Sequence, residues 1–125
     1  MPPEEQLVER LRQVCLALPE ATEKISHGSP SWFVRRMFVS YVGHHHGDEH
    51  LAIWVAAPEG AQEEMVTAEP ARFFVPPYVG HRGWLGMRLD VEPEGPDWDE
   101  VREVVTDAYR VVAPRRLAAR LGGGT

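Results

Sequence analysis

The sequence has little cysteine, little lysine and no long apolar run. Cys15 is the only cysteine among the 125 residues, so the chain can form no internal disulfide and has no Cys-x-x-Cys motif. No apolar stretch approaches the roughly 18 residues that suggest a membrane span. The acidic N-terminal stretch also lacks the apolar core of a signal peptide. We therefore expect a cytoplasmic protein without a membrane partner.

Positive charge is also in short supply. Thirteen Lys and Arg residues stand against nineteen Asp and Glu residues, which gives a formal net charge of −6, and Lys24 is the single lysine. This balance excludes a polycation that coats nucleic acid by bulk charge. The charge is unevenly distributed, however. Residues 24–56 and 70–91 contain six basic and three acidic residues, a net of +3, whereas the rest of the chain totals −9.

Catalytic motifs are missing as well. The sequence has no GxSxG, P-loop, HExxH or GxGxxG pattern. Hydroxyl groups at Ser26, Ser29 and Ser40 could react only with help from a base, and His27 and His81 are the plausible bases. We therefore expect a protein that is not an enzyme and has no cofactor, with an uncharacterised enzyme as a further alternative.

Hydrophobic periodicity predicts the fold. Helical spacing of apolar residues predicts helices over 7–18 and 101–112, the second capped by Asp97, with shorter helices after residues 60 and 114. Alternating or apolar stretches predict strands over residues 32–34, 37–42, 51–55 and 85–89. Short hairpin loops imply a mainly antiparallel sheet with helices packed on one face. We expect one α+β domain over 1–121, a two-layer α/β sandwich, and a flexible tail at 122–125.

Aromatic residues are expected on the other, uncovered face of this sheet. If Leu51, Ile53 and Val55 point to the helices, alternation turns Trp54 the other way, and the same holds for Trp84 and Arg88. Aromatic rings on an open face could stack on nucleic-acid bases while arginine meets phosphates. The alternative is that a loop, the segment around Tyr78 or a second subunit covers them.

Basic residues concentrate in the predicted strands and turns. A turn with Arg35 and Arg36 and another with His81 and Arg82 could act as two arginine-bearing wings that contact DNA. The candidate nucleic-acid-binding residues are Lys24, Arg35, Arg36, His81, Arg82 and Arg88. Ordinary solvated turns are the alternative, because exposed arginine is common.

A histidine-rich loop is the one candidate metal site. His44, His45 and His46 are followed by Asp48 and Glu49, and such groups can bind zinc or nickel. Three consecutive histidines on a flexible loop rarely converge on one tetrahedral site, and a site needs an ordered surrounding shell. We therefore expect no metal site.

Several stretches resemble one known family. The stretches 18–23, 26–34, 73–86 and 97–114 are similar to the YjbR/MmcQ family, and the similarity covers roughly residues 5–121. The run Phe73-Phe74-Val75-Pro76-Pro77-Tyr78-Val79-Gly80-His81-Arg82-Gly83-Trp84-Leu85-Gly86 is its most distinctive part. The resemblance implies a CyaY-like α/β sandwich and a bacterial DNA-binding protein, with no catalytic residue set. The chain departs from the family at Arg35-Arg36-Met37, where members commonly place a glycine in the turn.

Two interpretations from different classes follow. The first is a non-catalytic protein that binds nucleic acid, namely double-stranded DNA, through arginine-bearing hairpin turns. The second is a small-ligand-binding or homo-oligomerising module with an aromatic pocket or interface. Its residues would be Trp32, Trp54, Tyr78, His81 and Trp84.

Overall fold

The computed structural model describes residues 3–43, 50–91 and 95–121. Within these ranges six strands form one sheet, in which every pair of neighbours is antiparallel, in the order β1-β2-β3-β4-β6-β5. The strands are β1 (Thr22–Ser26), β2 (Ser29–Val34), β3 (Arg36–Gly43), β4 (Leu51–Val55), β5 (Phe73–Phe74) and β6 (Leu85–Arg88). The helices are α1 (Pro3–Leu16), α2 (Ala61–Ala68), α3 (Trp98–Val112) and α4 (Arg115–Leu121), with a 3-10 turn η2 (Gly80–Arg82). The α+β prediction is confirmed.

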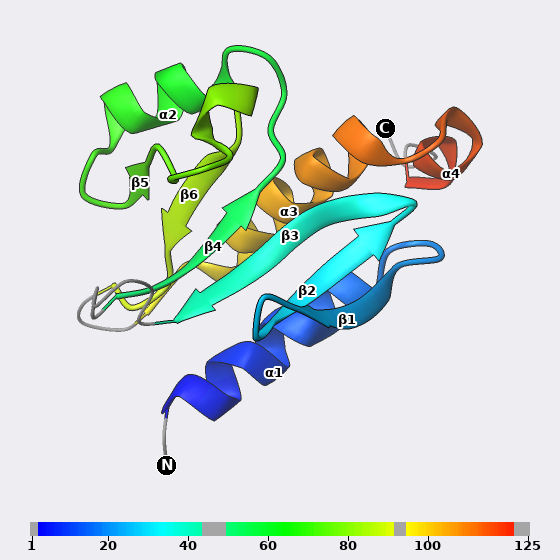
Figure 1. Cartoon of the computed structure of the whole chain (residues 1–125), viewed down its shortest axis with the longest axis horizontal. Coiled ribbons are helices and arrows are strands. Elements are labelled where there is room, and N and C mark those ends of the chain that lie inside the picture. The colour runs from blue at the N-terminus through cyan, green and yellow to red at the C-terminus, as the bar shows by residue number, and fades with distance from the viewer. Residues whose placement is uncertain (1–2, 44–49, 92–94, 122–125) are drawn as a thin grey trace.

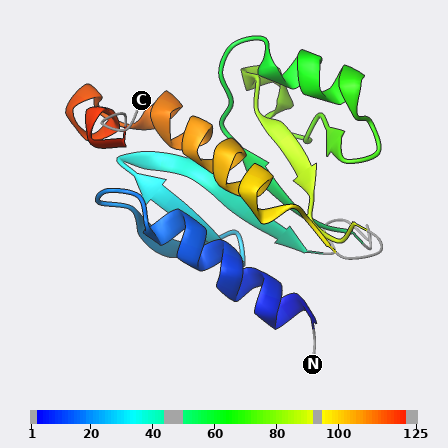
Figure 2. The same ribbon diagram turned by 180° about the vertical axis from the view of Figure 1, so that it is seen from behind.

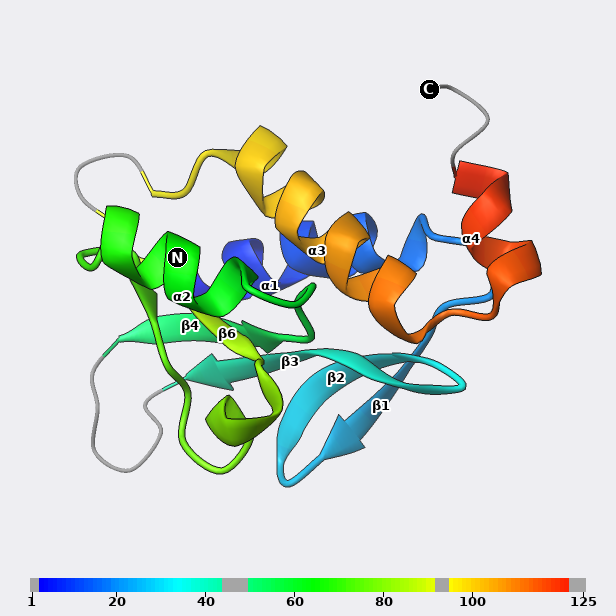
Figure 3. The ribbon, with the colours of Figure 1, turned by 90° about the horizontal axis from the view of Figure 1, so that it is seen from above.

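The helices lie on one side of the sheet. Figure 3 shows α1, α2 and α3 above the strands, and Figure 2 shows α1 and α3 side by side across the sheet. The opposite face, which Figure 1 shows from the front, has no α-helix over it in the described part of the chain. We call it the open face. No helix within the described residues has both the length and the apolar character needed to cross a bilayer.

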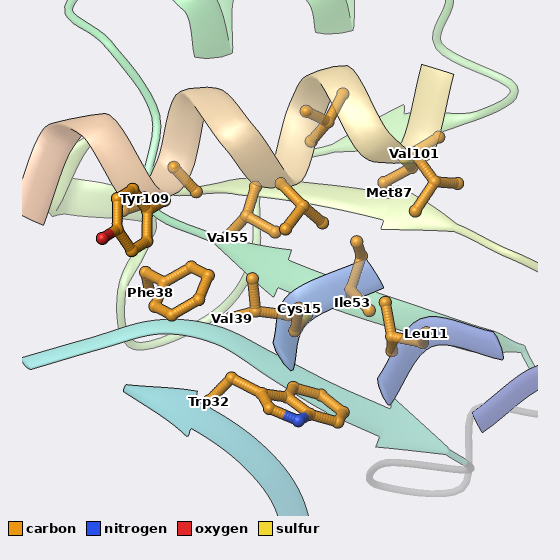
Figure 4. Close-up of a cluster of buried hydrophobic side chains, with 14 of the residues drawn as sticks. Leu11, Cys15, Trp32, Phe38, Val39, Ile53, Val55, Met87, Val101 and Tyr109 are labelled. Carbon is orange, nitrogen blue, oxygen red and sulfur yellow. The ribbon is translucent and has the colours of Figure 1, made fainter. Parts of the chain in front are cut away.

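The core lies between the sheet and the helices (Figure 4). Leu11 and Cys15 of α1 and Trp32 of β2 are fully buried there. Phe38 meets Tyr109 of α3 edge to face, with ring centroids 5.5 Å apart. Burial raises the pKa of the Cys15 thiol, because the thiolate would lose its hydration. Cys15 is therefore a core residue and not a nucleophile.

Local signals explain most element boundaries. Asp97 caps α3 as predicted, and its side chain accepts hydrogen bonds from the backbone N–H groups of Asp99 and Glu100. The turn between β2 and β3 is tighter than predicted, because Val34 pairs with Arg36 and only Arg35 lies between them. Arg35 adopts a φ of 70°, in the left-handed region that glycine occupies most easily.

Cross-strand register places one row of residues on the open face. Directly opposite residues on neighbouring antiparallel strands share a face. The row runs Lys24, Ser31, Ser40, Trp54, Gly86 and Phe74. The residues missing from this description include the predicted tail at 122–125 and the His44–His46 loop, so both predictions lie outside the described residues.

Candidate functional site

A groove of about 590 Å³ lies on the open face. One wall is the β1–β2 turn, and the other is the segment 76–83, which contains η2. Figure 3 shows both on the side of the sheet that faces away from the helices. The described lining residues include Ser26, His27, Ser29, Arg36, Met37, Ser40, Trp54, Tyr78, Val79, Arg82 and Trp84. Five of the residues proposed from the sequence line this groove, namely Arg36, Trp54, Tyr78, Arg82 and Trp84.

The floor of the groove comes from the sheet. Ser40 of β3 pairs with Trp54 of β4, so both side chains emerge on the open face. Trp54 is half-buried, and Trp84, just before β6, keeps only 7% of its surface exposed. Arg82 lies over the Trp84 ring, 5.6 Å from its centroid. A loop therefore partly covers the two tryptophans, as one of the two sequence-based alternatives expected.

Tyr78 forms the exposed edge of the aromatic surface. Tyr78 is 64% exposed, and its ring lies 6.4 Å from the Trp54 ring between centroids, at an interplanar angle of 54°. The backbone of Tyr78 has a φ of 67°, and Val79 N donates to Pro77 O at 2.6 Å. This is the pattern of a γ-turn with a positive central φ, which is rare and strained.

The wall around Tyr78 is anchored to the helical layer. Gln62 of α2 donates through Nε2 to the carbonyl oxygens of Gly80, at 2.8 Å, and Trp84, at 2.7 Å. Gly80 also packs so closely that a Cβ there would lie 2.6 Å from a methyl carbon of Val75. These contacts hold the segment 76–83 in place relative to the sheet.

The opposite wall is a two-residue hairpin turn. Ser26 pairs with Ser29, and between them His27 and Gly28 have φ values of 51° and 82°. Positive φ at both central residues is the signature of a type I′ turn, whose twist matches that of the flanking strands. The turn places the His27 side chain and two serine hydroxyls at the groove.

The charge of the groove is one-sided. Arg36 and Arg82 line it, and no Asp or Glu is among its described lining residues. No described carboxylate forms an ion pair with either arginine. Elsewhere in the described part, arginines commonly pair with acids, namely Arg12 with Glu9 and Glu23, Arg72 with Glu69 and Glu100, Arg102 with Asp99, Arg110 with Asp107, and Arg116 with Glu20. Within the described part of the chain, the groove therefore offers two guanidinium groups that pair with no carboxylate.

The other predicted cations lie around the groove without lining it. Arg35 is exposed at the tip of the β2–β3 turn, and His81 is exposed on η2. Lys24 lies over the Phe33 ring at 5.5 Å from its centroid. Arg88 lies over the Phe74 ring at 5.1 Å and donates to the carbonyl oxygen of Ala71 at 3.2 Å. These contacts use the Lys24 and Arg88 side chains to cover the sheet.

Trp32 requires a correction. The pocket interpretation placed it with Trp54 and Trp84, but its ring is fully buried under α1 on the helix-covered face. The register explains this, because Trp32 pairs with Val39, which pairs with the core residue Val55. Trp32 is therefore a core residue.

Sequence reasoning did not connect the β1–β2 turn to this groove. Ser26, His27 and Ser29 appeared only as isolated candidates for catalysis, whereas the structure places them opposite Tyr78 and Arg82. A usable signal was present, because a residue followed by glycine between two strands favours a two-residue hairpin. Within the described ranges no three His, Cys, Asp or Glu side chains group closely enough to hold a metal ion.

Comparisons with known proteins found a matching family model and a similar solved structure. The YjbR family model matches residues 16–111. The crystal structure of Deinococcus radiodurans protein DR2400, which has a DUF419 domain, is similar with a TM-score of 0.70 and 18% sequence identity. That similarity covers 94% of each chain. No curated protein matches the sequence.

Proposed function

The chain belongs to the YjbR family, and from the groove on its open face we propose that it binds nucleic acid without catalysing a reaction. The observation that carries this proposal is the pair Arg36 and Arg82, which have no carboxylate partner among the described residues and share the groove with aromatic side chains. Guanidinium groups bind phosphate through two parallel hydrogen bonds, and aromatic rings stack on bases.

The lack of carboxylates among the described lining residues matters because the protein is acidic overall. A net charge of −6 repels a polyanion at long range, so binding depends on the local field of the open face. Two phosphate contacts would give a log Kd–log salt slope of about 1.4 for a single strand and about 1.8 for a duplex. We therefore expect modest affinity that is highest at low salt.

Double-stranded DNA is the form that the sequence favours, through its two arginine-bearing turns. In the structure, Arg36 is the first residue of β3, next to the tip of the β2–β3 turn, and Arg82 lies on η2. Both residues line the same groove. Two cations from separate segments could contact phosphates of one ligand, which supports nucleic acid as the class of partner.

The test is fluorescence anisotropy with labelled 20-nucleotide DNA, as a duplex and as a single strand, at about 50 mM salt, where phosphate contacts are favoured. Arg36→Ala and Arg82→Ala should each weaken binding and lower the salt slope. Arg102→Ala is the matched control, because it removes the same charge from α3, where Arg102 pairs with Asp99. The proposal fails if neither DNA form binds, or if the control loses as much affinity as the groove variants.

A small anionic ligand with a flat ring is the second candidate. The groove volume of about 590 Å³ lies in the range of roughly 300–1,000 Å³ that small-molecule sites span. Titration with a metabolite panel, followed by tryptophan fluorescence, tests it. The small-ligand function requires that one compound of the panel binds saturably and that its affinity depends little on salt concentration.

A further inference from the structure

The aromatic surface of the groove indicates which form of nucleic acid it accepts. Resting on the proposed function, we infer that the groove takes a single-stranded segment. One unstacked base would lie on Tyr78 beside Trp54, and the neighbouring phosphates would meet Arg36 and Arg82.

The first argument is the accessibility of base faces. In a duplex both faces of each base are covered by stacking, so an aromatic ring in the protein gains little from contact with its exterior. Single strands can splay their bases onto aromatic side chains. Tyr78 is 64% exposed on the groove side of the molecule, next to the half-buried Trp54, and so offers a ring to such a base.

The second argument is shape. Figure 3 shows that the β1–β2 turn and η2 both project from the open face. Trp54 and Trp84 line the same groove as these two segments. The rigid convex exterior of a duplex would rest on these projections and not reach Trp54. A volume of about 590 Å³ is on the scale of a small organic ligand, which suits one or two nucleotides.

The third argument is preorganisation. Among the described residues, positive φ values occur at four non-glycine positions, Glu20, His27, Arg35 and Tyr78. His27 and Tyr78 line the groove, and Arg35 adjoins its lining residue Arg36. Such strain persists where surrounding structure enforces it and is concentrated at binding sites. The γ-turn and the anchor at Gln62 fix the backbone under the Tyr78 ring, so stacking costs little ordering entropy.

The experiment compares labelled dT10, the 20-nucleotide duplex of the preceding experiment, and the mononucleotide dTMP, all at about 50 mM salt. We expect dT10 to bind more tightly than the duplex. Tyr78→Gly removes the ring while glycine adopts the positive φ freely, and it should weaken dT10 binding roughly 5- to 100-fold. Tyr78→Phe, the matched control, should stay within about twofold of the original because the stacking face remains.

The outcomes separate this inference from the proposed function. Equal or tighter binding of the duplex, with Tyr78→Gly unchanged, overturns the inference but leaves nucleic-acid binding standing. Binding of dTMP as tightly as dT10 also overturns it and favours the small-ligand candidate. If neither DNA form binds, the proposed function fails and the inference fails with it. Circular dichroism of each variant establishes that lost binding is not lost folding.

Discussion

Trp32 Nε1 donates a hydrogen bond of 3.0 Å to Glu23 Oε1, across the β1–β2 pair. The same carboxylate accepts bonds from Arg12 of α1, at 2.7 Å from Nε and 3.0 Å from Nη2. Glu23 therefore links the first helix, the edge strand and the largest buried side chain of the core. Arg12 above all, with help from Trp32, holds the pKa of Glu23 below its usual value.

This lowered pKa predicts a defined acid sensitivity. Because the pKa of Glu23 is lower in the folded than in the unfolded protein, its ionised form stabilises the fold above the unfolded value of about 4.3. That contribution disappears as the pH falls through the folded pKa. Urea midpoints measured from pH 7 to pH 3 should fall at the acid end, and Glu23→Gln should lower the midpoint at pH 7 and flatten the acid decline.

Glu103→Gln is the control for the acid experiment, because Glu103 is an exposed carboxylate on α3. It should leave both the midpoint at pH 7 and the acid decline nearly unchanged. The prediction would be contradicted if the urea midpoint of Glu23→Gln fell with acid as steeply as that of the original protein.

Gly86 predicts a packing defect if it is enlarged. A Cβ at this position would lie 2.4 Å from the Phe74 ring, so Gly86→Ala must displace that ring from the open face. Overpacking of this kind costs about 1–3 kcal/mol of unfolding free energy. Chemical denaturation measures it, and the loss should shrink in the double variant with Phe74→Leu, since contacting residues couple. An unchanged free energy in Gly86→Ala would contradict the steric argument.

Arg35 predicts an unusual response to glycine. Its φ of 70° costs a non-glycine residue of order 1 kcal/mol, so Arg35→Gly should keep or raise the urea midpoint, whereas Arg35→Val should lower it. DNA binding should change less in Arg35→Gly than in Arg36→Ala, because only Arg36 lines the groove. A larger loss of binding in Arg35→Gly than in Arg36→Ala would instead indicate that the exposed tip of the β2–β3 turn is the main DNA contact.

Replacing Gln62 should weaken ligand binding indirectly, because Gln62 positions one wall of the groove. Gln62→Leu removes the donor to the carbonyl oxygens of Gly80 and Trp84, and unsatisfied groups of this kind cost about 1–3 kcal/mol of stability. The loosened wall should weaken dT10 binding while the salt slope stays the same, since no phosphate contact is removed. A changed slope with unchanged stability would instead indicate direct contact with the ligand.

The fold was largely readable from the sequence because its strands are half-buried. Alternation identified 51–55 and 85–89, and the Asp97 cap identified the start of α3. β1 was harder to read because it is an edge strand with a mostly exposed, irregular burial pattern, and its pairing with β2 holds it in place. The β2–β3 turn was also missed in detail, since nothing in Arg35 itself indicates a left-handed backbone.

About half of the groove could be predicted. Alternation gave Trp54 and Trp84, and the turn composition gave Arg36 and Arg82. The rest depends on register, because only the pairing across β1, β2, β3 and β4 brings the His27 turn opposite a segment some fifty residues later. Trp32 was misplaced for the same reason. The sequence of one strand does not show how it pairs with its neighbour, and this pairing decides which face of the sheet Trp32 lies on.

The separation of charges between the two layers gives the molecule an electric polarity. The segments outside residues 24–56 and 70–91 contain all four α-helices and total −9. Residues 24–56 and 70–91 contain the whole sheet except Thr22 and Glu23 and total +3. A polyanion is therefore repelled more strongly when it approaches the helices than when it approaches the strands. The field therefore favours encounters in which a polyanion meets the strand side first. Neutralising acids on the helices should raise the rate of all encounters, including unproductive collisions with the helical side.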